Sequence, residues 1–290
     1  MGKKTRKEHI VPQVHIRNFG YKNNNTDKII VIDKKKEQPY KASIDDVACQ
    51  RDFYEVSDKE VNYWEKWYGK IEQNIPSIYK SIIINSKFAS NGNKVLSEYL
   101  KKEISLIIIT QLLRTEVSKK HFIKLGCEIT NSIIDEIKDT LRSQLSNKDI
   151  EVLNKYRNNK DFIYSIALEH WNSNTFLRKA INILMSKIWI IHKNINYKTK
   201  PFVTSDNPVI MYNYYTKKVG LDYNGLTKAG TIIYYSINKE ILIAIYPNCK
   251  GLNNSNNSID FLNDDNFVMD FNRIIYEQCE RQVFYSLWFY

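Results

Sequence analysis

The feature that most constrains this chain is a change in the spacing of its apolar residues. Between residues 57 and 194 the apolar side chains recur every three or four positions, which is the period of an amphipathic helix. Short β-branched runs lie on both sides of that stretch, as in residues 28–33 (KIIVID) and 241–246 (ILIAIY). Strand-forming ends around a helical middle predict an α+β fold in which the terminal segments share a sheet.

The helical middle predicts about five or six helices. Its most apolar segment, with Ile104, Ile107 and Ile108, predicts a buried helix, whereas charged residues around Ile129 predict a helix with one exposed face. Pro76 interrupts an apolar run and predicts that a helix bends or restarts there. Further helices are expected over residues 149–156 and 176–191.

The two ends of the chain carry the strand predictions. A hairpin or small sheet is expected around residues 28–33. After residue 200 we expect a helix over residues 264–279 and strands over residues 202–204, 209–212, 231–235, 241–246 and 283–290. We therefore expect one domain, residues 1–290, in which a helical bundle (57–200) packs on a mixed or antiparallel sheet built from the N- and C-terminal segments (1–56 and 201–290).

Composition narrows the class of protein. The 290 residues include 20 Tyr, 12 Phe and 5 Trp, too many aromatic side chains for a disordered protein. The four cysteines form no CxxC pair, so we expect reduced thiols and a cytoplasmic protein rather than a disulfide framework or a zinc ribbon. No apolar run approaches the ~20 residues that span a bilayer, so no membrane association is expected. Walker, GxGxxG and GxSxG motifs are also absent from the sequence.

The net charge of the chain is basic. With 43 Lys and Arg against 32 Asp and Glu, the formal charge is +11, a sign that favours contact with nucleic-acid phosphates. Lys3, Lys4, Arg6 and Lys7 form a basic N-terminal arm. No zinc finger, RNA-binding aromatic signature or helix-turn-helix accompanies this charge, so a solvated basic surface is the alternative.

The first specific motif is residues 9–19, HIVPQVHIRNF. Pro12 suits the first position of a helix, on which Gln13 and Arg17 share one face. His9 precedes the free N–H groups of that helix start, which attract anions, and Arg17 can hold a phosphate or a carboxylate. The alternative is structural: Arg17 pairs with an acidic neighbour, and His9 caps the helix.

The second motif is residues 202–209, FVTSDNPV, in which a short apolar strand ends in polar residues. Side chains at such a strand end lie on a rigid edge. Asp206 is therefore a candidate metal ligand or general base, and Asn207 a candidate for orienting a bound group. The alternative is a turn in which both side chains bond their own backbone ahead of Pro208.

Arg114 lies on an otherwise apolar predicted helix. A buried guanidinium group needs a carboxylate partner, and Glu72 is the candidate. We expect this pair to be architectural rather than catalytic.

Together the two motifs resemble the bacterial family catalogued as domain-of-unknown-function family 4238. That family opens with a His-x-Val-Pro-x-x-Tyr-Leu-x-x-Phe pattern and carries Thr-Ser-Asp-x-Pro-Val at a strand end in its second half. A late helix has an Asn, and an Arg follows before a closing strand. The matching residues in this sequence are His9, Val11, Pro12, Ile16, Phe19, residues 204–209, Asn272 and Arg281.

The resemblance also bears on His15 and on the substrate. His15 stands where the family usually has an aromatic residue, so we expect it to pack rather than to act as a second catalytic histidine. Members of the family resemble mobile, defence-associated bacterial genes. That association implies a nucleic acid or a nucleotide as the substrate.

Three hypotheses of function follow. In the first, the chain is a nuclease or phosphodiesterase-like hydrolase of bacterial defence, with His9 and Asp206 as catalytic residues and with Mg²⁺ or Mn²⁺ as compatible metals. Its substrate-binding residues would be Gln13, Arg17, Asn207, Asn272 and Arg281. In the second, the same residues form the site of a non-catalytic ligand- or nucleic-acid-binding sensor module, whose helical middle contacts a protein partner. In the third, His9 and Asp206 only join the two ends of the chain.

Overall fold

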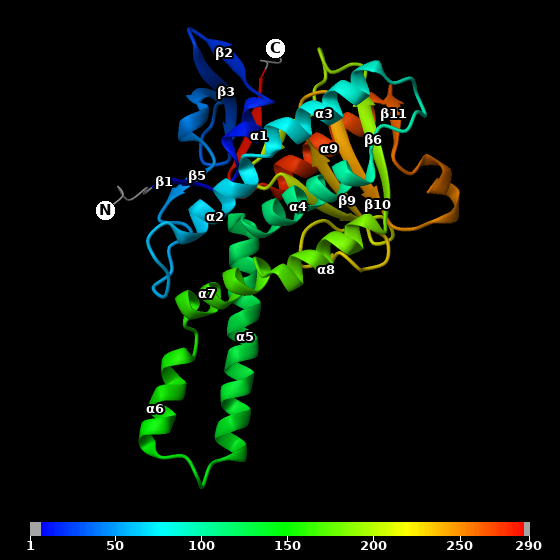
Figure 1. Cartoon of the computed structure of the whole chain (residues 1–290). Helices are drawn as coiled ribbons and strands as arrows, with labels where there is room; N and C mark the ends of the chain where they lie inside the picture. Colours follow the sequence, from blue (N-terminus) through cyan, green and yellow to red (C-terminus); the bar gives the residue numbers. More distant parts are fainter. Residues whose placement is uncertain (1–6, 287–290) are drawn as a thin grey trace.

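A computed structural model describes residues 7–286, which form an α+β fold (Figure 1). The helices and strands follow one another in this order: β1 (Lys7–His9), α1 (Gln13–Arg17), β2 (Tyr21–Asn23), β3 (Thr26–Asp33), β4 (Tyr40–Ser43), β5 (Cys49–Arg51), α2 (Tyr63–Glu72), α3 (Ile75–Phe88), α4 (Glu98–Leu113), α5 (Glu116–Thr140), α6 (Asn147–Tyr156), α7 (Lys160–Trp171), α8 (Asn174–Met185), β6 (Ile188–Asn194), β7 (Thr204–Ser205), β8 (Val209–Asn213), β9 (Thr231–Ser236), β10 (Ile241–Tyr246), β11 (Ser258–Leu262), α9 (Asp265–Gln278) and β12 (Gln282–Tyr285). Pro76 restarts a helix as predicted, because it lies in the first turn of α3.

The two ends of the chain share a sheet, as the sequence predicts. Strand β12 lies between β3 and β7 and is antiparallel to both, with Tyr285 opposite Ile30 and Phe284 opposite Thr204. Strands β2 and β4 also pair with β3. Figure 1 shows the C-terminal strand beside the N-terminal strands at one end of the molecule.

A second five-stranded sheet has the strand order β11-β6-β10-β9-β8. Helices α3, α4 and α8 cover one of its faces, and α9 covers the other. Strand β9 is buried throughout, with Ile233 and Tyr235 facing the first group of helices and Ile232 and Tyr234 facing α9. The main core therefore packs on this second sheet and not on the sheet that the two chain ends share.

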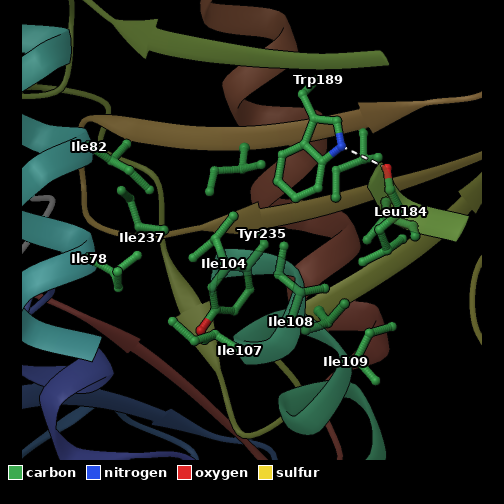
Figure 2. Packing of buried hydrophobic residues seen from close by; sticks show 14 of the residues in the cluster. Ile78, Ile82, Ile104, Ile107, Ile108, Ile109, Leu184, Trp189, Tyr235 and Ile237 are labelled. Carbon is green, nitrogen blue, oxygen red and sulfur yellow. Dashed lines mark hydrogen bonds between the residues drawn. The ribbon is translucent and has the colours of Figure 1, made fainter. Parts of the chain in front are cut away.

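The main core is built from β-branched and aromatic side chains (Figure 2). Ile104 and Ile108 of α4 are fully buried against the sheet, and each such side chain contributes about 1.5–3 kcal/mol to folding. Trp189 is also fully buried, and its indole N–H donates a 2.8 Å hydrogen bond to the Leu184 carbonyl oxygen. That bond satisfies the one polar atom of the largest core side chain.

Two secondary-structure predictions are wrong. The helix expected over residues 176–191 ends at Met185, and residues 188–194 form β6. Strand β6 lies between β10 and β11 and is buried on both faces, so it lacks the alternation of a half-exposed strand. Strand β11, which begins at Ser258 and is parallel to β6, is missing from the strands expected after residue 200.

Helices α5 and α6 extend away from the rest of the molecule as an antiparallel pair (Figure 1). Helix α7 returns the chain to the body and packs on α5. Within residues 7–286, no helix combines the length and the apolar character needed to cross a membrane.

Candidate functional site

The N-terminal motif is held by its apolar residues. Val11, Ile16 and Phe19 have no exposed surface and pack in a core with β3. Pro12 has an extended ψ of 133° and immediately precedes α1, one position earlier than predicted. Because these residues face inward, Gln13 remains half-buried and Arg17 exposed on the outer side of the short helix.

His9, Gln13 and Arg17 form a row of hydrogen bonds. The Nη2 atom of Arg17 donates to Gln13 Oε1 at 2.7 Å, and Gln13 Nε2 lies 3.1 Å from His9 Nε2. Since Arg17 occupies the amide oxygen, the amide N–H of Gln13 donates to the imidazole, which makes His9 Nε2 an acceptor. Arg17 also pairs with Asp27 at 3.0 Å, as the structural alternative for this residue predicts.

His9 is neutral in this setting. Burial lowers the pKa of its ring, with nearby Glu72 opposing the shift. With Nε2 accepting from Gln13, the ring proton belongs on Nδ1. A neutral, half-buried imidazole with a defined tautomer can accept a proton at Nε2 when a ligand displaces Gln13.

Side chains from the C-terminal end of α4 bind the main chain around His9. The guanidinium of Arg114 is buried and donates to the His9 carbonyl oxygen and to Glu72 Oε1, the latter at 2.5 Å. Gln111 donates to the Ile10 carbonyl oxygen at 3.0 Å. The ion pair expected between Arg114 and Glu72 is therefore present, and its position supports an architectural role.

Glu65 is a candidate that the sequence motifs do not include. Burial raises the pKa of its carboxyl group to about 7, and the charge of Arg114 opposes the shift. Its Oε2 atom is buried and has no hydrogen-bond partner among the described residues, although the carboxyl group contacts the His9 main chain. Glu65 and Glu72 are seven residues apart, so they lie on the same face of α2 as the buried residue Tyr68. This spacing is the sequence signal that could have identified the two glutamates.

Asp206 lies in the turn after β7, where its carboxylate binds main-chain N–H groups. It accepts from the N–H groups of Glu280, Arg281 and Gln282 at 2.9, 2.8 and 2.8 Å. Burial raises the pKa of Asp206 to about 6, and these hydrogen bonds oppose the shift. The carboxylate therefore positions the segment leading into β12.

The other predicted residues of the late segment also hold protein groups. Arg281 donates to Asp33 from Nε and Nη2, at 2.9 and 2.7 Å. Asn207 donates to the Gln278 carbonyl oxygen at 3.0 Å. Asn272 accepts from the Val203 N–H at 3.1 Å and donates to the Pro201 carbonyl oxygen at 2.9 Å.

A pocket of about 260 Å³ lies where the first motif meets the second. Ile10 borders it on one side, and Asp206 and Arg281 border it on the other. The remaining lining residues are Lys35, Ala48, Cys49, Gln50, Glu116, Lys120, Glu280 and Gln282. The structure thus brings the two motif segments together, but the His9 side chain is absent from this lining and belongs to the Gln13 row.

His15 packs in the interior, which confirms the predicted role. It is fully buried, and its ring nitrogens lie 2.9 Å from the Tyr79 hydroxyl and 2.9 Å from the Thr204 hydroxyl. The Tyr235 ring stacks on it at 5.0 Å. Burial lowers the pKa of His15 to about 3, so the ring is neutral and joins α1 to α3 and β7.

The cysteines and the acidic residues bear on metal binding. All four cysteines are free thiols, as predicted. Within the part of the chain that the structure describes, no three His, Cys, Asp or Glu side chains are grouped to hold a metal ion. Lys3, Lys4 and Arg6 of the predicted basic arm lie outside the described residues.

Comparison with protein families matches residues 7–287 to one family model, described as a protein of unknown function (DUF4238). Neither the curated proteins nor the solved structures contain a match. The match covers both motifs and the helical middle between them.

Proposed function

We propose, for a chain that belongs to the DUF4238 family of proteins of unknown function, a role as a ligand-binding module. The observation that carries this proposal is the pocket between the two motifs, whose lining includes Lys35, Lys120 and Arg281 from three separate segments. Asp206, at the floor of the pocket, already accepts three main-chain hydrogen bonds. Its role is to hold the pocket wall rather than to act as a general base.

The charges of the pocket favour a small ligand that carries a phosphate group. Lys120 forms ion pairs with Glu116 and Glu280, which offsets one of these two negative charges in the lining. Lys35 has no carboxylate within ion-pair distance among residues 7–286, so its ammonium group is available to an anion. The basic net charge and the free thiols support a phosphorylated or nucleic-acid ligand met in the cytoplasm.

Titration calorimetry of the full chain with AMP and with inorganic phosphate tests this role. Replacing Lys35 with Gln should weaken binding about tenfold, the effect of one lost charge-assisted hydrogen bond. Lys36→Gln is the matched control, because Lys36 lies over the Tyr40 ring and does not line the pocket. Failure of the wild-type chain to bind either probe, or equal binding by the Lys35 variant, contradicts the proposal.

A second candidate is a nuclease or phosphodiesterase-like hydrolase that acts through His9. It is favoured by the neutral imidazole of His9 and by the adjacent carboxyl group of Glu65, whose pKa is raised to about 7. Groups that titrate near neutrality suit acid–base catalysis. Gln13 and Arg17, which lie in the same row, would hold the phosphate of the substrate.

Hydrolysis of DNA, RNA and bis(p-nitrophenyl) phosphate, assayed with Mg²⁺ and with Mn²⁺, separates the two candidates. If the chain is a hydrolase, His9→Ala should reduce turnover at least a hundredfold, as expected for the loss of a general acid or base. His170→Ala, at an exposed histidine, should leave turnover unchanged. Binding of AMP without turnover in any of these assays supports the ligand-binding module.

A further inference from the structure

A larger cavity of about 420 Å³ lies between α9 and the second sheet, and no residue of either motif lines it. Tyr212 of β8 and Tyr234 of β9 line it from the sheet, and Phe267 and Phe271 line it from α9. Its volume lies within the range typical of small-molecule sites. None of these four residues belongs to the pocket between the two motifs.

The walls of this cavity present aromatic rings at steep angles to one another. The Tyr234 ring meets the Phe267 ring at a centroid distance of 6.2 Å and an angle of 76°. It meets the Phe271 ring at 6.1 Å and 74°. Rings in this arrangement offer both faces and edges, so a flat ring entering the cavity can stack on one wall and meet another edge-on.

The charged residues at the cavity leave one cation available. Arg273 pairs with Asp270 at 3.2 Å and with Glu277 at 2.9 Å, which neutralises one carboxylate and attracts the other. Lys217, across the cavity, has no carboxylate within ion-pair distance in the described part of the chain. Its ammonium group lies 4.2 Å from the centroid of the Tyr214 ring.

We propose that this cavity binds a planar aromatic molecule that carries one anionic group. The ring of the ligand packs among Tyr212, Tyr234 and Phe267, and its anionic group meets the ammonium group of Lys217. Burial of the ring provides the affinity, and the single unpaired cation selects a ligand with an acidic substituent. The ion pairs of Arg273 offset one of the two negative charges of Asp270 and Glu277, which reduces their repulsion of that substituent.

The backbone at Lys217 allows the cation to be removed without weakening the fold. Lys217 has a φ of +58°, in the left-handed region that Asn adopts more readily than Lys. Lys217→Asn therefore deletes the charge and should leave the melting temperature unchanged or slightly higher. Lys218→Asn is the control, because this neighbouring lysine lies over the Tyr223 ring and does not line the cavity.

Calorimetric titration of the full chain with 2-naphthalenesulfonate tests the proposal. We expect one site per chain, about tenfold weaker binding in Lys217→Asn and unchanged binding in Lys218→Asn. Phe267→Leu, which keeps an apolar side chain but removes a ring, should also weaken binding, with its melting temperature recorded alongside. Lys35→Gln should have no effect, which separates this site from the pocket between the motifs.

Two further ligands define the selectivity. 2-Methylnaphthalene lacks the charge and should bind the wild-type chain and Lys217→Asn equally weakly, and sulfate lacks the ring and should not bind detectably. Absence of 2-naphthalenesulfonate binding, or equal binding by the wild-type chain, Lys217→Asn and Phe267→Leu, overturns the proposal.

Discussion

The guanidinium group of Arg281 donates two hydrogen bonds to Asp33, although the two residues come from opposite ends of the chain. The Asp33 side chain is fully buried, and Arg281 lowers its pKa to about 2. The pair joins the end of β3 to the residue that precedes β12, so it fixes how the two ends of the chain meet.

This pair should make the fold sensitive to acid. Asp33→Asn should lower the free energy of unfolding at pH 7 by about 1–3 kcal/mol, because Arg281 loses a charged acceptor. The folded-state pKa lies below the ordinary Asp value of about 4, so the contribution is complete above pH 4 and is lost as the pH falls toward 2. Urea unfolding of both proteins at pH 7 and at several acidic pH values measures it.

The control for Asp33 is Asp27→Asn, which removes the exposed partner of Arg17. That pair should contribute less than about 1 kcal/mol. An Asp33→Asn protein with the stability and acid profile of the wild-type chain would show that Arg281 and Asp33 do not hold the ends together.

Asp206→Asn should destabilise the protein by about 1–3 kcal/mol, because an amide N–H₂ replaces one of the oxygens that accept main-chain hydrogen bonds and leaves a buried donor unpaired. Chemical denaturation measures the loss. Asp264→Asn makes the same substitution at a carboxylate that accepts two N–H groups at the start of α9. Since Asn is an equally good helix cap, that control should change stability by less than about 0.5 kcal/mol. Equal effects at the two sites would count against a structural role for Asp206.

The buried ring of His15 should give the free energy of unfolding a second dependence on pH. Its folded-state pKa of about 3 lies below the ordinary value of about 6.5, so the stability that the neutral ring provides is present above pH 6.5 and is lost as the pH falls toward 3. His15→Phe should remove up to about 1.4 kcal/mol per pH unit from the acid slope of the unfolding free energy. His170→Gln, which replaces an exposed histidine, is the matched control. Identical slopes for the wild-type chain and His15→Phe would contradict the buried neutral imidazole.

Two helical glycines should respond to alanine with opposite signs. A Cβ atom at Gly69 meets nothing within 4 Å, so Gly69→Ala should stabilise α2 by about 0.5–1 kcal/mol. A Cβ atom at Gly126 would lie 2.4 Å from Cγ2 of Ile163, which is itself buried. Gly126→Ala should therefore lower the melting temperature by forcing α5 away from α7. A melting temperature raised by both substitutions would show that the two helices pack less closely than this contact indicates.

The fold was predictable where the apolar residues of an element follow a helical spacing or form a β-branched run. The helical spacing of Ile104, Ile107 and Ile108 predicts α4, and the β-branched run over residues 28–33 predicts most of β3. Strand β6 was not predictable in this way, because its residues Ile188 and Trp189 are buried on both faces and carry no period. The periodicity of apolar residues in a sequence depends on which face of an element is exposed to water. A central strand such as β6 has no exposed face.

The candidate site was predictable in its segments but not in its partners. The sequence places polar side chains such as His9 and Asp206 at the ends of short apolar elements, and the structure brings those segments to one pocket. Asp206 bonds the main chain near residues 280–282, which only the tertiary fold supplies. The partner of His9, Gln13, lies four residues away in the same motif. The sequence motifs do not include Glu65, because its raised pKa arises from burial and the residue type does not reveal burial.

The position of β12 determines when the fold can be completed. Strand β12 supplies the middle of the sheet that contains β3, yet it is synthesised after every other strand of the described chain. Until then, β3 lacks the partner that covers one of its edges, and such an edge is prone to pair with other chains. The sheet that contains β3 is therefore completed only once β12 has been synthesised, and nascent chains stalled before residue 282 should depend on chaperones to stay monomeric.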